Sequence, residues 1–484
     1  MSLKIISTFG DHSSLYPLAV KDIVNSLGMT AYSYESGGQK KEEKEVEAKD
    51  RFIDEFGTEA IWLGGLPFFK WLADKTIYKN KNLNPDIDVR LINNKEHLEV
   101  AKKYAKAFAE KLGKADIADD LLNAEKNSGL FKKLFYGKFG VATALTLASY
   151  FTLTLLKQNY TNKQVKKREL RKLAQEAEFN KNISQTPAFK AFVMNQNSNK
   201  EAAQKGNKIP SFKGFGSMAM DVVNKFAFNP VHNMFIVDTG ITSERLIMAR
   251  NKHEKVEYAI KEGSLLFFMY VAGKYVQRGI EYVSDKVFNR PIKLHAEFLS
   301  SDTFKNAINK NTVASHLNEF NNLKDNKAIY DFIYNESNAE NLIVKAAKKS
   351  GIINVIDESG VKLNPLQKFI NIFKIHAKPE TGLVNPHQFI DVNELKDLSK
   401  NIEKFVQRQK TSGETVEQFL KNATKFKVGS VVANLGISCL FLGVIVPMMM
   451  KKYKEKYYGS GSHIQNGIKE QLEKTNFGQK PLKA

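Results

Sequence analysis

The chain has 484 residues, 42% of them hydrophobic, and its 73 lysines and arginines against 52 aspartates and glutamates give a formal net charge of +21. A mean hydropathy of −0.37 excludes a chain that lies mostly within a membrane, and it leaves room for about three to four spans. Most of the mass is therefore expected in water or on a bilayer surface.

The positive charge is carried almost entirely by lysine, because only nine of the 73 basic residues are arginine. Arginine has the planar fork that recognises bases and phosphates, whereas lysine is a hydrated point charge that suits anionic lipid headgroups. We therefore expect membrane lipids rather than nucleic acid as a partner. The single cysteine, Cys439, excludes an intramolecular disulfide and a cysteine metal site, and no cofactor motif is present.

The N-terminal residues 1–58 are predicted to be a soluble lead that ends in a charged linker, SGGQKKEEKEVEAKD. Residues 59–138 begin with an apolar patch, AIWLGGLPFF, which is too short to span a bilayer and contains two glycines and a proline. We favour an interfacial or re-entrant segment over 59–73, with Trp62 and Trp71 as interface anchors, followed by a soluble helix. A true span and a soluble core are the alternatives for the patch.

Residues 139–156 form an uncharged run of 18 residues, the minimum for a transmembrane helix. A long helix buried in a soluble core is the alternative. Residues 157–261 then contain a strongly basic juxtamembrane helix, a polar loop and a further helix. The basic side chains expected to contact anionic lipid on the cytoplasmic side are Lys163, Lys166, Lys167, Arg168, Arg171 and Lys172.

Residues 262–282 contain an uncharged stretch of only 11 residues, so a membrane crossing there stays open. Residues 290–425 are polar and helix-rich, and we predict that they form one soluble helical domain. The uncharged run at 428–450 has 23 residues and would extend for about 34 Å, enough to cross a bilayer. Its expected interface anchors are Lys425, Lys427, Lys451 and Lys452.

The sequence therefore predicts a mainly α integral membrane protein, multi-pass in a cell membrane, with two firm transmembrane helices, up to four membrane segments and a helical soluble domain. Residues 451–484 form a basic flexible tail in this interpretation. If 262–282 crosses, the tail lies in the cytoplasm together with residue 157. If it does not cross, residues 157–427 form one cytoplasmic domain and the tail lies outside. Lysines flank both ends of both firm spans, so the charge distribution does not choose between these topologies.

Three blocks of the sequence are familiar: RFIDEFGTEAIWLGG at 51–65, NPVHNMFIVDTGITSERL at 229–246 and IKEGSLLFFMY at 260–270. They resemble uncharacterised integral membrane proteins that occur as many paralogues in AT-rich gut bacteria. The resemblance covers most of residues 1–285. It implies a membrane location and no known activity.

The sharpest catalytic candidate is Asp238, in the string FIVDTG. This string resembles the active site of aspartic proteases, where a strand leads into Asp-Thr-Gly and two aspartates share a proton. Ile241 stands where that family has a small residue, the flanks favour helix, and there is no second copy, so a homodimer would have to supply the other aspartate. A polar turn before a helix is the favoured alternative.

Two weaker patterns are also present. His253 and Glu257 lie on one helix face and could provide two zinc ligands, but no third ligand is evident. Asp86 and Asp88 resemble the paired aspartates that hold a divalent cation, although an ordinary turn explains them as well. We therefore nominate no metal site.

These observations favour a non-enzymatic scaffold or interaction protein that is anchored in the membrane and presents its helical domain to an unknown protein partner, with a homo-oligomer left open. The alternatives are a membrane enzyme that uses Asp238, and a small transporter or channel subunit. A transporter requires polar residues along a pathway, and the two firm spans contain no charge.

Overall fold

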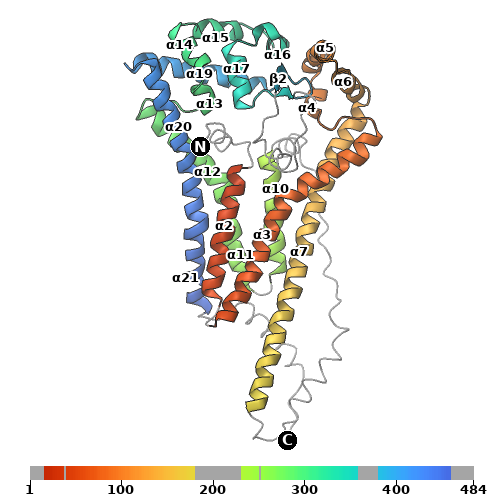
Figure 1. Ribbon diagram of the computed structural model, residues 1–484, viewed down its shortest axis with the longest axis vertical. Helices are drawn as coiled ribbons and strands as arrows, with labels where there is room; N and C mark the ends of the chain where they lie inside the picture. The colour runs from red at the N-terminus through yellow and green to blue at the C-terminus, as the bar shows by residue number, and fades with distance from the viewer. Residues whose placement is uncertain (1–15, 38–39, 180–229, 250–251, 358–379, 459–484) are drawn as a thin grey trace.

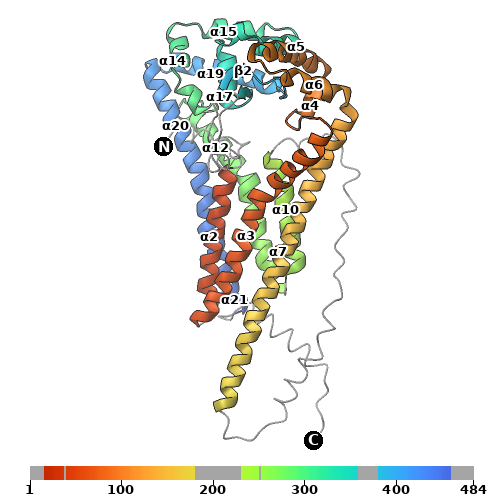
Figure 2. The same ribbon diagram turned by 45° about the vertical axis from the view of Figure 1, so that its right-hand side comes forward.

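The fold of the chain is shown in Figure 1 as a computed structural model, which describes residues 16–37, 40–179, 230–249, 252–357 and 380–458. The protein is mainly helical, as the sequence predicts, and its helices form two parts (Figures 1 and 2). Long helices form a bundle, and short helices form a head domain that lies across one end of the bundle.

Six helical rods make up the bundle within the described residues, and three of them continue through a π-helical turn. The rods are α2 (Tyr16–Ser36), α3 (Lys41–Ala73) with η1 (Asp74–Tyr78), α7 (Ser128–Phe179), α10 (Pro230–Met248), α11 (Lys252–Leu266) with η3 (Phe267–Ala272) and α12 (Gly273–Lys286), and α20 (Val416–Leu440) with η5 (Phe441–Ile445) and α21 (Val446–Tyr458). At 1.5 Å per residue, each rod is about as long as a bilayer hydrocarbon core of ~30 Å, or longer.

The rods α3 and α7 are antiparallel. Lys138 pairs with Asp74 at 2.7 Å near the head domain, and Thr161 donates a hydrogen bond to Asp50 at 2.6 Å farther along the bundle. The end of the bundle that lies away from the head domain carries the basic continuation of α7 after Lys157, and we call it the basic end.

The rods α2 and α20–α21 run parallel to each other, toward the basic end. Gly28 abuts Gly443, and two turns farther on Lys451 lies 3.2 Å from Glu35. A Cβ atom on Gly28 would come within 2.9 Å of the Cα of Gly443, so the two backbones touch. Small residues at a helix crossing permit this close approach, as they do between helices in membranes.

The rod α10 also runs toward the basic end, because Gln158 of α7 donates to the carbonyl of Met248, the last residue of α10, at 2.9 Å. The next rod, α11–α12, returns toward the head domain. Only three residues separate α10 from α11, and Tyr270 donates a hydrogen bond to Asp238 farther up.

The outer surface of the bundle is apolar. Two of its helices are long and apolar enough to cross a membrane by length and composition, Ser128–Gln164 and Val416–Tyr457. Only 28% of the residues in the most apolar window of each are buried inside the protein. The large exposed apolar side chains on these two helices include Val141, Leu145, Leu155, Leu156, Val432, Ile437, Leu440, Val444, Met448 and Met449.

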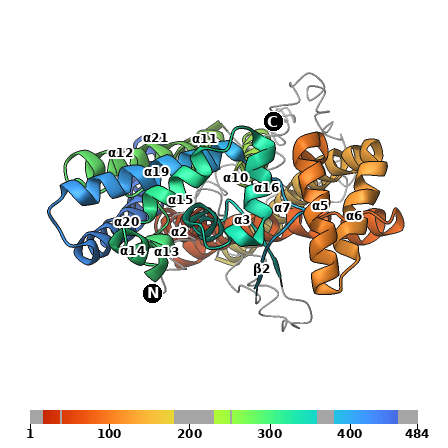
Figure 3. The ribbon, with the colours of Figure 1, turned by 90° about the horizontal axis from the view of Figure 1, so that it is seen from above.

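The head domain combines segments that are far apart in the sequence (Figure 3). Its elements are α4 (Val89–Asn93), α5 (Lys95–Leu112), α6 (Asp116–Lys126), α13 (Ala296–Leu299), α14 (Asp302–Asn309), α15 (Val313–Asn321), α16 (Asn326–Tyr334), η4 (Glu336–Asn338), α17 (Leu342–Ser350), β1 (Val355–Asp357), β2 (Glu380–Val384) and α19 (Val392–Thr411). The two strands pair antiparallel. One hydrophobic cluster, from Tyr78 to Ala423, joins all the segments, so the expected domain at 290–425 also includes residues from the 59–138 region.

Local sequence signals explain the short helices of the head. Six α-helices of the head begin at an Asp, Asn or Ser side chain that accepts a hydrogen bond from a backbone N–H. This bond satisfies a donor that has no partner within the helix. These N-caps include Asp88, Asn94, Ser301, Asp325, Asn341 and Asp391. Gly113 and Gly351 end α5 and α17 with φ of 65° and 76°, values that favour glycine.

Residues 16–73 differ from the sequence-based expectation. The expected soluble lead contributes α2, and the last part of the expected linker opens the 33-residue helix α3. This helix continues through Gly64, Gly65 and Pro67, so the 59–73 region is neither re-entrant nor broken. Neighbouring rods on both sides of α3 stabilise a helix that local propensity disfavours.

Residues 139–156 and the basic helix after them belong to one helix, the 52-residue α7. Residues 451–458 of the expected flexible tail continue α21. The remaining tail and the polar loop after α7 lie outside the described residues.

The crossing of α2 and η5 gives a stability prediction. Gly28→Ala forces the two backbones apart, and overpacking of this kind costs about 1–3 kcal/mol. The midpoint of thermal unfolding in detergent should fall. The matched control is Gly436→Ala in α20, where an added Cβ meets no atom within 4 Å and improved helix propensity should leave stability unchanged or slightly higher. Equal effects of the two changes would show that the close crossing does not matter.

The head domain should be sensitive to acid because of His97, which is 0% exposed. Its ring stacks on Tyr330 at 3.9 Å between centroids, its Nε2 lies 3.1 Å from the hydroxyl of Tyr334, and burial lowers its pKa to about 3. Between this pKa and the unfolded value of about 6.5 the unfolded state binds the extra proton. Stability should therefore fall by up to about 1.4 kcal/mol per unit as the pH decreases from about 6.5.

The measurement is denaturant unfolding followed by circular dichroism at several pH values. His97→Phe removes the proton-binding group and should flatten the dependence on pH. An unchanged slope in this variant would contradict the assignment to His97.

Candidate functional site

One face of α3 carries ionisable side chains into the interior of the bundle. Asp50, Asp54 and Glu55 are buried, and the latter two are each only 2% exposed. Their spacing of four and five residues places them along one side of the helix, toward the other rods. Arg51 lies beside them with a side chain that is 11% exposed. Buried carboxylates require nearby cations or protons, since an isolated charge is very costly in an apolar interior.

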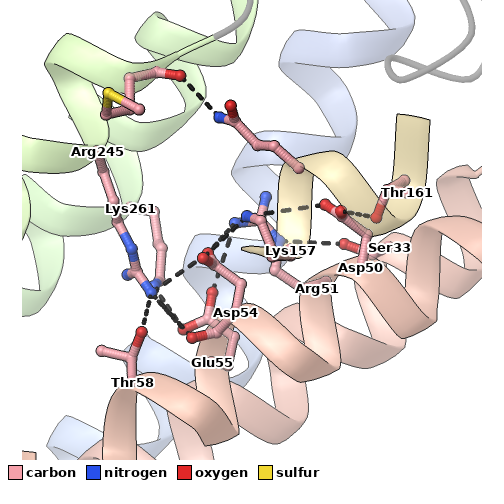
Figure 4. A network of polar contacts seen from close by, with 12 residues as sticks. Ser33, Asp50, Arg51, Asp54, Glu55, Thr58, Lys157, Thr161, Arg245 and Lys261 are labelled. Atoms are coloured by element: carbon pink, nitrogen blue, oxygen red, sulfur yellow. Dashed lines mark hydrogen bonds and ion pairs between the residues drawn. The ribbon is translucent and has the colours of Figure 1, made fainter. Parts of the chain in front are cut away.

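Two lysines from other rods meet these carboxylates (Figure 4). Lys157 of α7 has its Nζ 2.9 Å from Asp54 Oδ1 and 3.8 Å from Asp50 Oδ2. Lys261 of α11 has its Nζ 2.6 Å from Glu55 Oε2. Both lysines are buried, so these ion pairs connect α3 to α7 and α11 inside the bundle.

Arg245 of α10 completes the connections. Its guanidinium lies 3.2 Å from Asp54 Oδ2 and donates to Thr58 Oγ1 at 3.0 Å. On its other side it pairs with Glu262, whose Oε1 also lies 2.9 Å from the Nζ of Lys261. Three rods thus meet at a single guanidinium, and α7 joins them through the pair of Lys157 with Asp54.

Polar contacts also connect these residues to α2. Arg51 lies 3.4 Å from Glu55 and 4.0 Å from Glu257, and its Nε donates to Ser33 at 3.3 Å. Tyr32 of α2 donates to Glu257 at 3.2 Å. We call the eight central residues the ion cluster: Asp50, Arg51, Asp54, Glu55, Lys157, Arg245, Lys261 and Glu262.

The eight residues of the ion cluster comprise four carboxylates and four cations, and Glu257 adds a further buried carboxylate beside Arg51. Buried ion pairs in which each carboxylate meets a cation suit a structural role. Among the described residues, no group of three or more His, Cys, Asp or Glu side chains is arranged to hold a metal ion.

A small cavity lies beside the ion cluster, toward the head domain. Its volume of about 10 Å³ is about the space of one water molecule. Its polar lining consists of Asp22, Asp238, Glu55, Glu262, Arg245 and Thr58, and Trp62 is among the other side chains around it. The cavity therefore adds two carboxyl groups, Asp22 and Asp238, to the cluster's own.

Asp238 does not lie in the setting that its sequence suggested. The string FIVDTG is the middle of helix α10, neither the strand end and loop of an aspartic protease nor a turn before a helix. The side chain of Asp238 is 6% exposed and accepts a hydrogen bond from Tyr270. A buried carboxyl in a packed bundle has no access to a peptide substrate.

The two tryptophans lie on different sides of α3. Trp62 is 1% exposed and packs in the interior, so its assignment as an interface anchor is wrong. The physical reason is that other rods of the bundle cover one side of α3, and Trp62 lies on that covered side. Trp71 is 53% exposed and stacks on Phe68, with ring centroids 6.0 Å apart.

The expected lysine anchors of the last rod divide in a similar way. Lys425 and Lys452 are exposed, and Lys451 pairs with Glu35. Lys427 is buried at 9% exposure, which differs from the extended side chain that an anchor at the membrane surface needs. In the basic part of α7, Lys163 and Lys167 are exposed, and the side chains of Lys166, Arg168, Arg171 and Lys172 lie outside the described residues.

The weaker candidates have ordinary structural roles. Asp88 is the N-cap of α4 and pairs with Arg90 at 2.6 Å, and the backbone of Asp86 bonds the Asn84 side chain in a turn. Glu257 contacts Tyr32 and Arg51, as described above.

Sequence reasoning missed the ion cluster. The available signal was the pattern Asp50-Arg51 and Asp54-Glu55 immediately before the apolar patch, in a segment that was assigned to soluble linker. Had α3 been recognised as one long helix, the four-residue spacing would have placed these charges on one face. The partners Lys157, Arg245 and Lys261 come from three other helices, and no local pattern connects them.

Breaking the ion cluster should destabilise the bundle strongly. Arg245→Met keeps the apolar stem but leaves Asp54 and Glu262 without their shared cation, which costs about 3–5 kcal/mol. The midpoint of thermal unfolding in detergent should fall by several degrees. The matched control is Lys103→Met, which breaks an exposed ion pair to Asp331 and should cost at most about 1 kcal/mol. A drop of the same size in both variants would contradict the structural role of the cluster.

The sequence matches no protein-family model, and comparisons with curated proteins and with solved structures find no similar protein or fold. The interpretation of this chain therefore depends on its own geometry.

Proposed function

We propose that this protein is a multi-pass membrane protein whose bundle crosses the bilayer and holds the head domain at one membrane surface as a scaffold for a protein partner. The observation that carries the proposal is the distribution of polarity in the bundle. The ionisable residues of the ion cluster face inward and pair with one another, while the exposed large apolar side chains of α7 and the last rod include leucine, valine, isoleucine and methionine. This arrangement is unfavourable in water and typical of helix bundles in lipid.

The dimensions of the bundle support this placement. On α7, the uncharged run at 139–156 begins directly after Lys138, which pairs with Asp74, and ends at Lys157 in the ion cluster. Its 18 residues extend for about 27 Å, close to the ~30 Å hydrocarbon core of a bilayer. On the last rod, the run at 428–450 ends at Lys451, which pairs with the end of α2.

The proposed topology depends on whether the rod formed by α11, η3 and α12 crosses the membrane. This rod contains the undecided segment 262–282 and packs along α20, with Asn434 donating to Gln277 at 3.5 Å. In our proposal this rod crosses too, and the C-terminal end of α21 lies on the same side as the basic part of α7. If that side is the cytoplasm, the head domain faces outward.

The alternatives have less support. Asp238 is buried in a helix, which disfavours an aspartic-protease-like enzyme. The interior cavity has the volume of one water molecule, which is too small for an open channel. The head domain has its own hydrophobic core and carries exposed ion pairs such as Lys327–Glu99 and Lys345–Glu340, and these features suit binding to a protein partner.

Cysteine accessibility tests the crossing. On a Cys439→Ala background, single cysteines replace Lys103 and Lys349 on the head domain and Lys163 and Glu455 at the basic end, all at exposed positions. An impermeant maleimide should label the two head positions in intact cells, and the two basic-end positions only after permeabilisation. The protein should stay in the membrane pellet after alkaline carbonate extraction.

Labelling of all four positions from one side would contradict the crossing, and the opposite pattern of labelling would contradict the orientation. For the scaffold role, photo-crosslinkers at the same four positions in cells should trap a discrete protein at the head positions. Crosslinks confined to the basic end would contradict a role for the head.

A further inference from the structure

Two carboxyl groups of the cavity have no cation. Asp22 of α2 is 9% exposed, lines the cavity, and makes no ion pair or hydrogen bond with its side chain among the described residues. Asp238 of α10 lines the same cavity and accepts a hydrogen bond from Tyr270. The Trp62 indole lies beside Asp238. A third carboxyl, Glu59, is 6% exposed and lies near Asp22.

The cations nearest to this cavity are already occupied. Arg245 contacts Asp54 and Glu262, and Lys261 contacts Glu55 and Glu262. Arg245 and Lys261 thus serve other carboxylates as well, and Asp22 and Asp238 add negative charge for which the described residues provide no ion-pair partner. Lys21 precedes Asp22 in the chain, but its Nζ is directed to the carbonyl of Phe268 at 3.3 Å.

Two ionised carboxylates in a small, apolar cavity are unfavourable, because each loses its hydration and each repels the other. One proton removes the repulsion and the desolvation cost of one of the two carboxylates, whereas a metal ion would need a set of oxygen ligands that the described residues do not arrange here. The shared cavity, the missing cation and the hydrogen-bond donor Tyr270 therefore favour a carboxyl group that carries a proton.

The charged and titratable groups that face Asp22 and Asp238 come from several rods. α3 contributes Glu55, Glu59 and Trp62, and α7 contributes Tyr150. α10 contributes Arg245, α11 contributes Lys261 and Glu262, and η3 contributes Tyr270. The positive groups in this set are those of the ion cluster.

The cavity is closed toward the head domain by an apolar layer. One helical turn toward the head from four of the nine lining residues lies a buried apolar side chain, because residues four apart share a face. This layer consists of Leu18 above Asp22, Met234 above Asp238, Leu66 above Trp62 and Met269 above Leu265, all in one hydrophobic cluster.

Toward the basic end, the surroundings of the cavity are polar. One turn below Asp22 is Ser26, one turn below Trp62 is Thr58, and one turn below Leu265 is Glu262. Glu55 and Arg245 line the cavity and also belong to the ion cluster. Polar side chains therefore continue from the cavity to Lys157 and to Thr161 at the level where the uncharged run of α7 ends.

We propose that Asp22 and Asp238 form a proton-binding site in the interior of the bundle that exchanges protons with the basic end and is closed toward the head domain. The ligand is a single proton held by one of the two carboxyl groups. Its release leaves two carboxylates in the cavity, of which that of Asp238 faces Tyr270 and Trp62. The sidedness of this proposal rests on the proposed membrane crossing, whereas the proton-binding site itself does not.

The two tryptophans make a direct test possible. Trp71→Phe removes the exposed one and leaves Trp62, beside Asp238, as the only fluorophore of its kind. In detergent, the emission of Trp62 in the full chain should titrate with pH. Asp22→Asn and Asp238→Asn should each shift the midpoint of this titration, and the double variant should abolish it. The matched control, Asp397→Asn on the exposed face of α19, should leave the titration unchanged.

The asparagine variants also separate the proposal from a merely structural role. Asparagine resembles a protonated aspartate in size and charge, so Asp22→Asn and Asp238→Asn should leave the midpoint of thermal unfolding at neutral pH unchanged or raise it. Asp54→Asn removes an ionised partner of Arg245 and Lys157 and should lower it by several degrees. A large destabilisation by Asp238→Asn would mean that Asp238 is ionised and paired, and would overturn the proposal.

Sealed proteoliposomes test the sidedness. The fraction of molecules with their basic end outward is measured with the impermeant maleimide on the Cys439→Ala background. After a pH change in the outer solution alone, the same fraction of the Trp62 emission change should occur at once, and the remainder only after a proton carrier is added.

A complete response without the carrier, or none, would overturn the one-sided exchange. A response to Na⁺ at constant pH would overturn the choice of a proton as the ligand. If carbonate extraction removes the protein from membranes, the crossing fails, but the titration in detergent still tests the proton-binding site.

Discussion

The ion cluster is the constraint on which the arrangement of the bundle depends. Each carboxylate that α3 carries inward needs a cation from another rod, and Lys157, Arg245 and Lys261 provide one each from α7, α10 and α11. These contacts fix the height of four helices relative to one another, because a shift of one turn would separate every pair by about 5 Å. Contacts between similar apolar side chains define this register less strictly, because one such side chain can replace another of about the same size.

The sequence predicts correctly those features that depend on the composition of one continuous segment. The runs at 139–156 and 428–450 are long and uncharged, and both lie within the two helices that are long and apolar enough to cross a membrane. The rods α2, α3 and α10 escaped prediction because they carry their charges inside the bundle. The sequence around Asp54 and Glu55 is polar and predicts a segment exposed to water. Their interior position depends on ion pairs with Arg245 and Lys261, which come from other helices.

The two tryptophans show the same limit within one helix. Trp62 and Trp71 are nine residues apart, which is two and a half helical turns, so they lie on opposite faces of α3. A composition window treats them alike and assigns both to the membrane surface. The difference between 1% and 53% exposure comes from the rods that cover one face of α3, and this information is not local.

The head domain is not an independent attachment to this bundle. The helix α7 contributes Phe131 to the head core and Tyr150 to the bundle core, and α20 likewise contributes Phe419 to the head while its continuation η5 contributes Leu442 to the bundle. A continuous helix transmits a tilt along its whole length, whereas a flexible linker would absorb it. Since Leu147 of α7 packs on Gly240, two residues from Asp238, a rearrangement around that carboxyl group would move the helices that carry the head domain. If the proposed crossing and the proton-binding site are correct, protonation of the bundle interior would therefore be coupled to the position of the head domain.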